Sequence, residues 1–459
     1  MLSRIFRSFH GSSQILLLNR SVMTEVAAKD WLQPPERVRG ITTLDKELFR
    51  DKISVPCLPI PSRVVGRVHG LKCIKDFGVP RMNRVKSIVE GSSKEERMIL
   101  FNPNLLSNSI KEQIIEDISN VTNVDKSTLV FGTKEIELNY EDWDIKRCFK
   151  AVLPDGLEFS GFSQIGHIAH CNLREELLPY KHVIASILLD KTAWCKTVVN
   201  KVDEINTKFR FFEMELLGGE QNYIAEVKEG KVRYRLDFSK LFWNSRLGTE
   251  HARLFKKFNS RSLVYDACAG VGPFAIPAAL NGVRRVLAND LNPESVKYLK
   301  ENVELNKAPA ISVFNKDAMD FIREEVAEDL TKEFALPFEE RASEAHVLMN
   351  LPALAVTFLP AFKNFLKVKP EFPVIVHCHL FAKAHEDVPD EFYPEEAKRM
   401  VLESMGVEEG RVKILEVHNV RKVAGRKEMF CVSFELPEDY VVAVESEEPE
   451  AKRAKLANC

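Results

Sequence analysis

The sequence lacks three features that would assign it to a special class of protein. Its nine cysteines include no CxxC pair, which argues against a zinc ribbon and predicts reduced thiols in an intracellular protein. No apolar run reaches the roughly 18 residues that a membrane-spanning helix needs. Neither sign of charge dominates, because 65 Lys and Arg against 67 Asp and Glu give a net charge of −2. Composition alone therefore does not indicate a partner such as nucleic acid or membrane.

The two ends of the chain differ in composition from the rest. Residues 1–23 combine arginines and serines with apolar residues at helical spacing, and no acidic residue precedes Glu25. This composition predicts a mitochondrial transit peptide. Translation starting at Met23 would give a form without it, so we expect a mitochondrial matrix protein with nuclear and cytoplasmic forms. Residues 442–459 predict a disordered polar tail, whose KRAK run is either a nuclear signal or a solvated charge cluster.

Between these ends the sequence predicts a short linker and three domains. Residues 24–40 are polar and are interpreted as the linker. Residues 41–148 predict a small α+β domain, and residues 149–243 a mainly β middle domain with Glu229-Gly230 as a hairpin turn. Residues 244–441 alternate strand and helix patterns, which predicts an α/β domain of the Rossmann-like type with a mostly parallel sheet.

A glycine-rich turn in the last domain raises the question of its ligand. The stretch VYDACAGVGPFAIPAAL runs from a short apolar strand through Asp266, Gly270 and Gly272 into a helical pattern. GVGPFA fits the dinucleotide fingerprint GxGxxA, with Asp290 twenty residues after Gly270. However, Asp266 four residues before Gly270 gives the D-x-x-x-G-x-G pattern of S-adenosylmethionine enzymes. We expect both glycines to let the backbone approach that cofactor closely.

Acidic residues follow the next two predicted strands as well. Asp290, with Leu291 beside it, is placed to accept hydrogen bonds from two ribose hydroxyls. Asp317 is placed to accept from the adenine amino group, and Ala318 leaves room beside the ring. One acidic residue at a strand end is often only a helix cap. Because the carboxyl ends of parallel strands form the ligand-binding edge, three in succession favour a cofactor site.

The fourth predicted strand ends in Asn350-Leu351-Pro352. The Asn350 amide can both donate and accept, which suits the polar edge of a flat heterocycle, and Pro352 stiffens the turn that presents it. Nearby, VHCHL has the residue types of a metal site. We expect no metal there, because side chains alternate along a strand and His377, Cys378 and His379 cannot all point one way.

At this point the sequence resembles the eukaryotic and archaeal tRNA (guanine(37)-N1)-methyltransferases. The resemblance extends from about residue 40 to 440, and its most specific blocks are IGHIAHCNLREELLPYK and FWNSRLGTEHARL. Further support comes from FRFFEMELLGGE, NDLNPESVKYLKENVELN, MNLPALA and VRKVAG. The resemblance implies a class I fold and methyl transfer to N1 of the tRNA guanine beside the anticodon, supporting reading-frame maintenance.

The resemblance also implies roles for particular residues. Neutral guanine carries a hydrogen on N1, so a base must remove it while charge develops on O6. Glu250 matches the family's general base, Arg210 its catalytic arginine, and Asn350 the residue that orients the guanine. His251 is a candidate cofactor contact. Phe242 departs from the family, where a tyrosine is expected, so no role is assigned to it.

Substrate contacts and alternatives are less sharply defined. Candidate tRNA contacts are Arg246, Arg421, Lys422 and Arg426, together with the basic run SRVVGRVHGLKCIKDFGVPRMNRVK. A charge run can equally be a solvated face. We expect a monomer, because no heptad seam is visible. Three alternatives stay open: a methyltransferase for another RNA position or ring nitrogen, a nicotinamide oxidoreductase, and a non-catalytic RNA-binding module.

Overall fold

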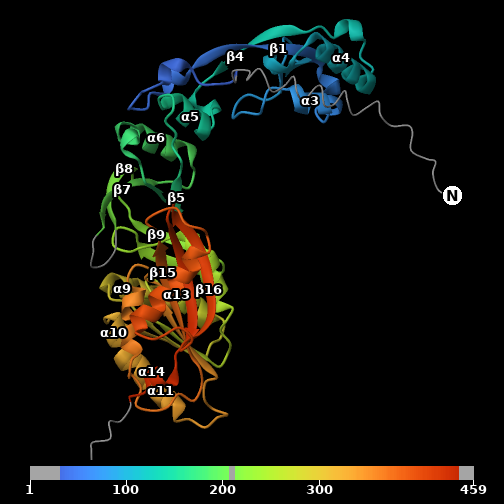
Figure 1. Ribbon diagram of the computed structural model, residues 1–459. Helices are drawn as coiled ribbons and strands as arrows, with labels where there is room; N and C mark the ends of the chain where they lie inside the picture. The colour runs from blue at the N-terminus through green and yellow to red at the C-terminus, as the bar shows by residue number, and fades with distance from the viewer. Residues whose placement is uncertain (1–30, 206–211, 444–459) are drawn as a thin grey trace, which may run out of the picture. The chain divides into compact units, whose positions relative to one another are not determined.

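The computed structural model describes residues 31–205 and 212–443, which divide into two compact units. Of these residues, the first unit takes in 31–160 and Leu173–Ala193, and the second takes in Gly161–Asn172, 194–205 and 212–443 (Figure 1). Each unit has its own hydrophobic core. In the described residues, no helix combines the length and the apolar character needed to cross a membrane.

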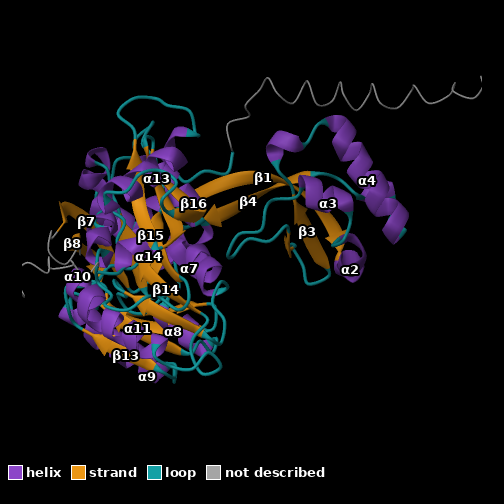
Figure 2. Cartoon of the chain, turned by 60° about the horizontal axis from the view of Figure 1, so that its bottom comes forward, coloured by secondary structure: helices purple, strands orange, loops and turns teal. Residues whose placement is uncertain are grey.

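The first unit is an α+β fold around a four-stranded antiparallel sheet. Its strand order is β2-β3-β1-β4, and Figure 2 shows helices α3 and α4 beside this sheet. The unit contains two hydrophobic core clusters, and neighbouring residues of β1 point into different ones. Cys57 belongs to one cluster and Leu58 belongs to the other. Ser107 caps α4 by accepting a hydrogen bond from the Ile110 N–H. The strands are β1 Asp51–Pro61, β2 Ile88–Glu90, β3 Glu96–Leu100 and β4 Gly132–Leu138. The helices are α2 Val65–Val68, α3 Lys72–Phe77, α4 Asn108–Thr122, α5 Ile145–Val152 and α6 Lys181–Lys191.

The second unit begins with two small antiparallel elements. A four-stranded sheet has the order β5-β6-β7-β8, in which only β6 and β7 are parallel, and β9 pairs with β10 as a hairpin. The hairpin turn is Gly230-Lys231, one residue later than predicted, because Gly230 takes the left-handed conformation at φ 58° and Glu229 pairs with Val232. The strands are β5 Phe162–Ile165, β6 Ile168–Cys171, β7 Thr197–Ile205, β8 Phe212–Gly219, β9 Ile224–Glu229 and β10 Val232–Asp237.

The predicted middle domain, residues 149–243, does not form a third unit. Val183 and Ile187 of α6 pack into the core of the first unit. Ile168 and Val199 pack into the same core as the residues of the large sheet in the second unit. The predicted boundary follows a change in sequence pattern, whereas the units are set by which apolar faces cover one another.

The large sheet of the second unit has seven strands in the order β13-β12-β11-β14-β15-β17-β16. The first five are parallel, and β17 runs antiparallel to both β15 and β16. The strands are β11 Ser262–Asp266, β12 Arg285–Asn289, β13 Ile311–Phe314, β14 Glu344–Met349, β15 Val374–Lys383, β16 Lys413–Ala424 and β17 Lys427–Glu435. This is the predicted Rossmann-like parallel sheet, and β16 and β17 are the predicted closing antiparallel strands.

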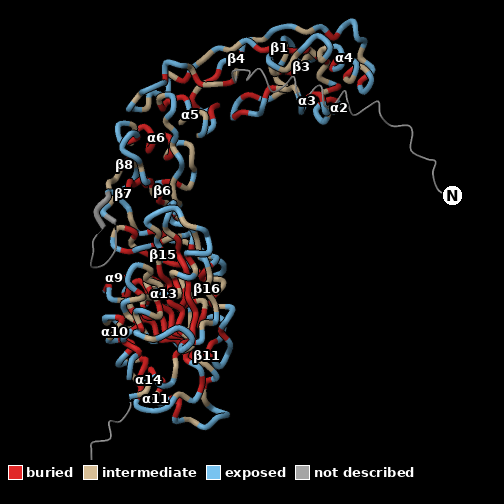
Figure 3. Tube along the Cα trace, in the orientation of Figure 1, coloured by how far each residue is buried: buried red, intermediate tan, exposed pale blue. Residues whose placement is uncertain are grey.

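Helices cover both faces of this sheet, and its strands are the most deeply buried part of the unit (Figure 3). One core contains residues of α8 and α9, and the other contains residues of α11 and α13. The helices are α7 Gly248–Phe255, α8 Ala275–Leu280, α9 Pro293–Leu305, α10 Ala318–Phe321, α11 Ala327–Phe334, α12 Ala355–Phe358, α13 Phe392–Met405 and α14 Glu438–Val441. The strand order reverses between β11 and β14, and such a switch point is where open α/β sheets bind ligands.

Candidate active site

Asp266, the last residue of β11, lies at the switch point and is completely buried. No hydrogen bond of acceptable geometry reaches either of its carboxylate oxygens from the described residues. Burial, with a smaller contribution from the Asp290 charge, raises the pKa of Asp266 to about 7. The Cys268 N–H and the His379 charge oppose this shift without cancelling it. A buried carboxylate so weakly compensated is costly, so this position is suited to a ligand that donates hydrogen bonds or carries positive charge.

The two glycines of the turn serve different purposes. Gly270 has φ +55°, and a Cβ added there would meet nothing within 4 Å, so its backbone borders open space. Gly272 has φ +97°, and an added Cβ would lie 2.7 Å from Leu299 Cδ1 and 2.8 Å from Ile276 Cδ1. Protein atoms thus fill the space beside Gly272, and its backbone contact with the cofactor stays a prediction. Gly272 is needed because helix α9 and the start of α8 pack directly against it.

Asp290 follows β12 and stabilises the glycine-rich turn by hydrogen bonds. Its Oδ2 accepts the Gly270 N–H at 2.8 Å, and its Oδ1 accepts the Asn292 N–H at 2.9 Å. A carboxylate has about four acceptor positions, so acceptor capacity remains for a ligand hydroxyl. Burial raises the pKa of Asp290. The neighbouring Leu291 is 45% exposed, an apolar surface at the edge of the sheet.

Asp317 is exposed and caps α10 by accepting the Met319 N–H at 2.8 Å, while Ala318 beside it is buried. Asp317 thus has the ordinary capping role, and its exposed carboxylate also lies at the end of β13, as predicted. On the other side of the switch point, Asn350 follows β14 directly. Within the described part of the chain, the buried Asn350 Oδ1 has no hydrogen-bond partner. Pro352 lies in the turn that follows.

Glu250, in the first turn of α7, is 2% exposed and is held by three donors. Arg253 donates from Nε to Glu250 Oε2 and from Nη2 to Oε1, each at 2.7 Å, and His379 Nε2 lies 2.9 Å from Oε1. Burial alone would raise the pKa of Glu250, but these hydrogen bonds outweigh burial and hold it well below its usual range. The predicted base is therefore an ionised carboxylate.

His251, the next residue, points its ring toward two different neighbours. Its Nδ1 lies 2.8 Å from Glu229 Oε1, and its ring meets that of Phe274 edge-on at 4.7 Å. Its buried Nε2 finds no hydrogen-bond partner among residues 31–205 and 212–443. The arrangement leaves one ring nitrogen free for a ligand, and the cofactor contact of His251 stays a prediction.

The predicted tRNA contacts fall into two groups. Arg246 is exposed, and Arg421 of β16 is half-buried; partial burial and the Arg246 charge lower the pKa of Arg421. These two cations are thus close enough to repel, which favours an anion between or beside them. Lys422 is exposed on the same strand. Arg426 instead donates from Nε to Asp387 Oδ1 at 2.9 Å and to the His385 carbonyl, so its charge is already offset. Arg210 lies outside the described residues.

The three side chains of VHCHL do not all point one way: His377 and His379 share a face of β15, whereas Cys378 packs into the core with Val376 and Leu380. His377 contacts His346 and Ser433, whereas His379 contacts Glu250. Potential ligand atoms of Glu250, His379 and Cys431 lie within 4.8 Å of one another. Arg253 already occupies both oxygens of Glu250, so the arrangement is better described as a hydrogen-bonded ion cluster than as a metal centre.

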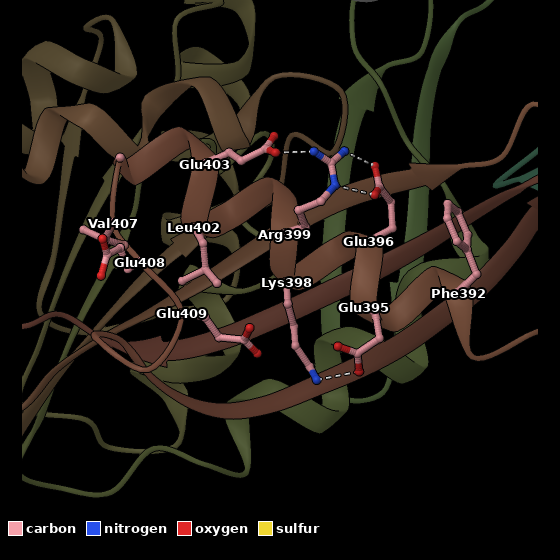
Figure 4. Close-up of a pocket in the computed structure, with 11 residues that line it drawn as sticks. Phe392, Glu395, Glu396, Lys398, Arg399, Leu402, Glu403, Val407, Glu408 and Glu409 are labelled. Atoms are coloured by element: carbon pink, nitrogen blue, oxygen red, sulfur yellow. Dashed lines mark hydrogen bonds and ion pairs between the residues drawn. The ribbon is translucent and has the colours of Figure 1, made fainter.

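A surface groove along α13 holds none of the predicted site residues. Figure 4 shows that its basic side chains are paired: Arg399 with Glu396 at 2.7 Å, and Lys398 with Glu395 at 2.6 Å. Neither cation of the groove is therefore left for an anionic ligand. Sequence reasoning missed two residues that do belong to the site, Arg253 and His379. The i, i+3 spacing on α7 could have revealed Arg253, but His379 is 129 residues from Glu250.

Comparison with known proteins places this geometry in a family. A model of the TRM5/TYW2 methyltransferase domain matches residues 225–404, and one of the TYW2 N-terminal domain matches residues 145–222. A tRNA (guanine(37)-N(1))-methyltransferase of Caenorhabditis elegans is 42% identical, covering 93% of this chain and 97% of the relative. The Homo sapiens protein of that name is 37% identical, covering 91% and 80%.

Solved structures share the fold. Trm5b from Pyrococcus abyssi is 21% identical, with a TM-score of 0.55 over 83% of this chain and 99% of that one. The structure described as the complex of aTrm5 and tRNALeu is 20% identical, with a TM-score of 0.57 over 83% and 99%. These likenesses confirm the predicted class I methyltransferase fold with a preceding α+β domain.

Proposed function

The chain belongs to the tRNA (guanine(37)-N1)-methyltransferase family, and from that premise we propose that it methylates N1 of guanine 37 in tRNA. Position 37 lies next to the anticodon, so the modification supports reading-frame maintenance. One observation in the structure supports this most directly. Asp266 and Asn350 flank the switch point with buried oxygens that lack hydrogen-bond partners in the described residues.

The residues at this edge fit the cofactor S-adenosyl-L-methionine, which supplies a methyl group on a positively charged sulfonium. Asp266 offers a buried carboxylate for a donor group, and Gly270 leaves open space at the turn. Asp290 and Asp317 keep acceptor capacity for hydroxyl and amino groups. The remaining residues of the proposed cofactor site are Leu291, Ala318, His251 and Pro352.

The protein's own residues then have to prepare the guanine. Glu250, ionised in the resting structure, takes the proton from N1 and leaves an electron pair on N1. The cofactor, when bound, would supply the methyl group to this pair, and the electrons of its broken S–C bond would stay on sulfur. Asn350, with its free Oδ1, orients the base. Arg210 neutralises the charge that develops on O6, a role that rests on the family resemblance alone. We assign phosphate contacts to Arg246 and Arg421, with Lys422 as a further contact.

The experiment that tests this function uses labelled S-adenosylmethionine and two transcripts of one tRNA, with guanine or adenine at position 37. We expect 1-methylguanosine from the first transcript only, identified by nuclease digestion and mass spectrometry. Because the matching family model spans both TRM5 and TYW2 proteins, the alternative is methylation of another RNA position or ring nitrogen. Label at another position, or label in both transcripts, would support that alternative.

Three further properties are part of the proposal. We infer a monomer without a resident metal, located in the mitochondrial matrix, with nuclear and cytoplasmic forms. The composition of residues 1–23, which lie outside the described residues, supports the location. The two hydrogen bonds from Arg253 to Glu250 support the absence of a metal. A fluorescent reporter carrying residues 1–23 should enter mitochondria, light scattering should give 52.3 kDa, and activity should survive EDTA. A cytosolic reporter, a dimer mass or loss of activity would each contradict the corresponding part.

A further inference from the structure

Three histidines lie buried on the face of the large sheet that also contacts Glu250 of α7. His346 comes from β14, and His377 and His379 come from β15. A titratable ring in a sheet core costs free energy unless it is hydrogen-bonded. The three rings have different partners, and the difference separates a structural pair from a third ring with another role.

His346 and His377 contact each other, and His346 Nε2 lies 3.2 Å from Glu344 Oε1. His346 Nδ1 lies 3.0 Å from His377 Nε2, and His377 Nδ1 lies 2.8 Å from Ser433 Oγ. Burial and the positive charges of neighbours including Arg253 and Lys257 hold the pKa of His377 well below its usual range. His377 is therefore a neutral ring whose bonds are explained by packing.

His379, two residues along the same strand, faces a carboxylate instead of another histidine. It is fully buried, and its Nε2 lies 2.9 Å from Glu250 Oε1. Burial would lower its pKa, but adjacent Cys431 and the Glu250 carboxylate raise it to about 10. His379 Nδ1 makes no well-formed hydrogen bond to any described residue. The His379 ring therefore has the Glu250 carboxylate as its one strong partner, and Cys431 and Phe274 also lie against the ring. A buried ring in this setting is best explained by its contact with that carboxylate.

The groups around Glu250 together fix the plane of its carboxylate. Arg253 forks onto both oxygens, His379 adds a third donor at Oε1, and His418 lies 3.6 Å from Oε2. Burial and the Arg253 charge lower the pKa of His418, so it adds no firm charge. The proposed base therefore depends on two buried cations, one on its own helix and one on β15.

We propose that His379 is a positioning residue that keeps the Glu250 carboxylate charged and fixed in one orientation for removal of the guanine N1 proton. The inference rests on the proposed function. In the step itself the N1–H bond breaks and the proton moves to a Glu250 oxygen. His379 keeps its own protons and acts only through Glu250.

A double-mutant cycle tests this role, with single-turnover formation of 1-methylguanosine as the readout. The variants are His379→Gln, Glu250→Gln and the double variant; glutamine keeps an N–H donor and cannot carry charge. His379→Gln should slow the single-turnover rate about tenfold. It should also move the acid limb of the pH profile, the range in which the rate falls as the pH is lowered, to higher pH, since the carboxylate loses a cation. In the Glu250→Gln background, the same change should alter the rate by less than about twofold. The His379 charge also lowers the pKa of Asp266, so S-adenosylhomocysteine affinity is compared at about pH 9, well above that pKa, where it should stay unchanged.

His377→Gln is the matched control, because it alters a buried histidine on the same face that does not touch Glu250. It should leave the acid limb in place. Equal losses for His379→Gln in both backgrounds, or the same shift in His377→Gln, would overturn the inference. If His379→Gln does not fold, His379→Asn replaces it in the same cycle, and equal losses for His379→Asn with and without Glu250→Gln would overturn the inference. Wild-type protein that makes no 1-methylguanosine would instead refute the proposed function.

Discussion

Alanine in place of Gly272 should mainly lower the stability of the protein, whereas alanine in place of Gly270 should mainly weaken cofactor binding. The two residues stand only two positions apart. Gly272→Ala places an L-residue at φ +97°, which costs about 1–3 kcal/mol. Its Cβ would lie 2.7 Å from Leu299 Cδ1 and 2.8 Å from Ile276 Cδ1. Such overpacking costs about 1–3 kcal/mol more. The free energy of unfolding should therefore fall by roughly 2–6 kcal/mol.

Gly270→Ala should lower the free energy of unfolding by only about 1–2 kcal/mol, the cost of a left-handed backbone at φ +55°. Its Cβ would meet no atom within 4 Å, so no packing cost is added. That open space is where the proposed cofactor would lie, so the methyl should weaken binding instead. We expect S-adenosylhomocysteine affinity to fall about 5- to 100-fold, equivalent to about 1–3 kcal/mol.

Differential scanning calorimetry and isothermal titration calorimetry on both variants check the pair. At about 2–4 °C per kcal/mol, Gly272→Ala should lower the melting temperature by roughly 4–24 °C. Gly270→Ala should lower it by only a few degrees. The reasoning fails if Gly270→Ala is the less stable variant. It also fails if Gly270→Ala binds S-adenosylhomocysteine as tightly as wild type does.

Two further predictions concern charge. The folded protein keeps the Asp266 proton up to about pH 7, whereas the unfolded chain loses it near the ordinary value of 3.8; this residue's contribution to stability is therefore lost as the pH rises from about 4 to 7. The melting temperature of Asp266→Asn, relative to that of the cofactor-free wild type, should therefore rise as the pH increases from about 4 to 7. A difference that stays constant over this range would contradict a buried carboxylate that keeps its proton. Arg246→Gln and Arg421→Gln should each weaken tRNA binding and reduce the slope of log Kd against log salt by about 1. Arg426→Gln, already paired with Asp387, should change the slope less, and equal slopes for all three would argue against this assignment.

The sequence by itself determined the parts of the site that depend on local signals. Asp266, Asp290, Asp317 and Asn350 each follow a short apolar strand, and parallel strands bring their carboxyl ends to one edge. The sheet type followed from the alternation of strand and helix patterns in the same way. Glu250 could be placed in the first turn of a helix, since that too is a local property.

Only the tertiary structure decided which distant residues meet. Val183 of the predicted middle domain packs in one unit and Val199 in the other, because packing of apolar faces overrides their nearness in sequence. Similarly, Gly272 is required by Leu299, a contact that no turn pattern reveals. The ion pair between Glu250 and His379 joins residues 129 positions apart. Its existence depends on how α7 packs against β15, and the charge state of the proposed base follows from that packing.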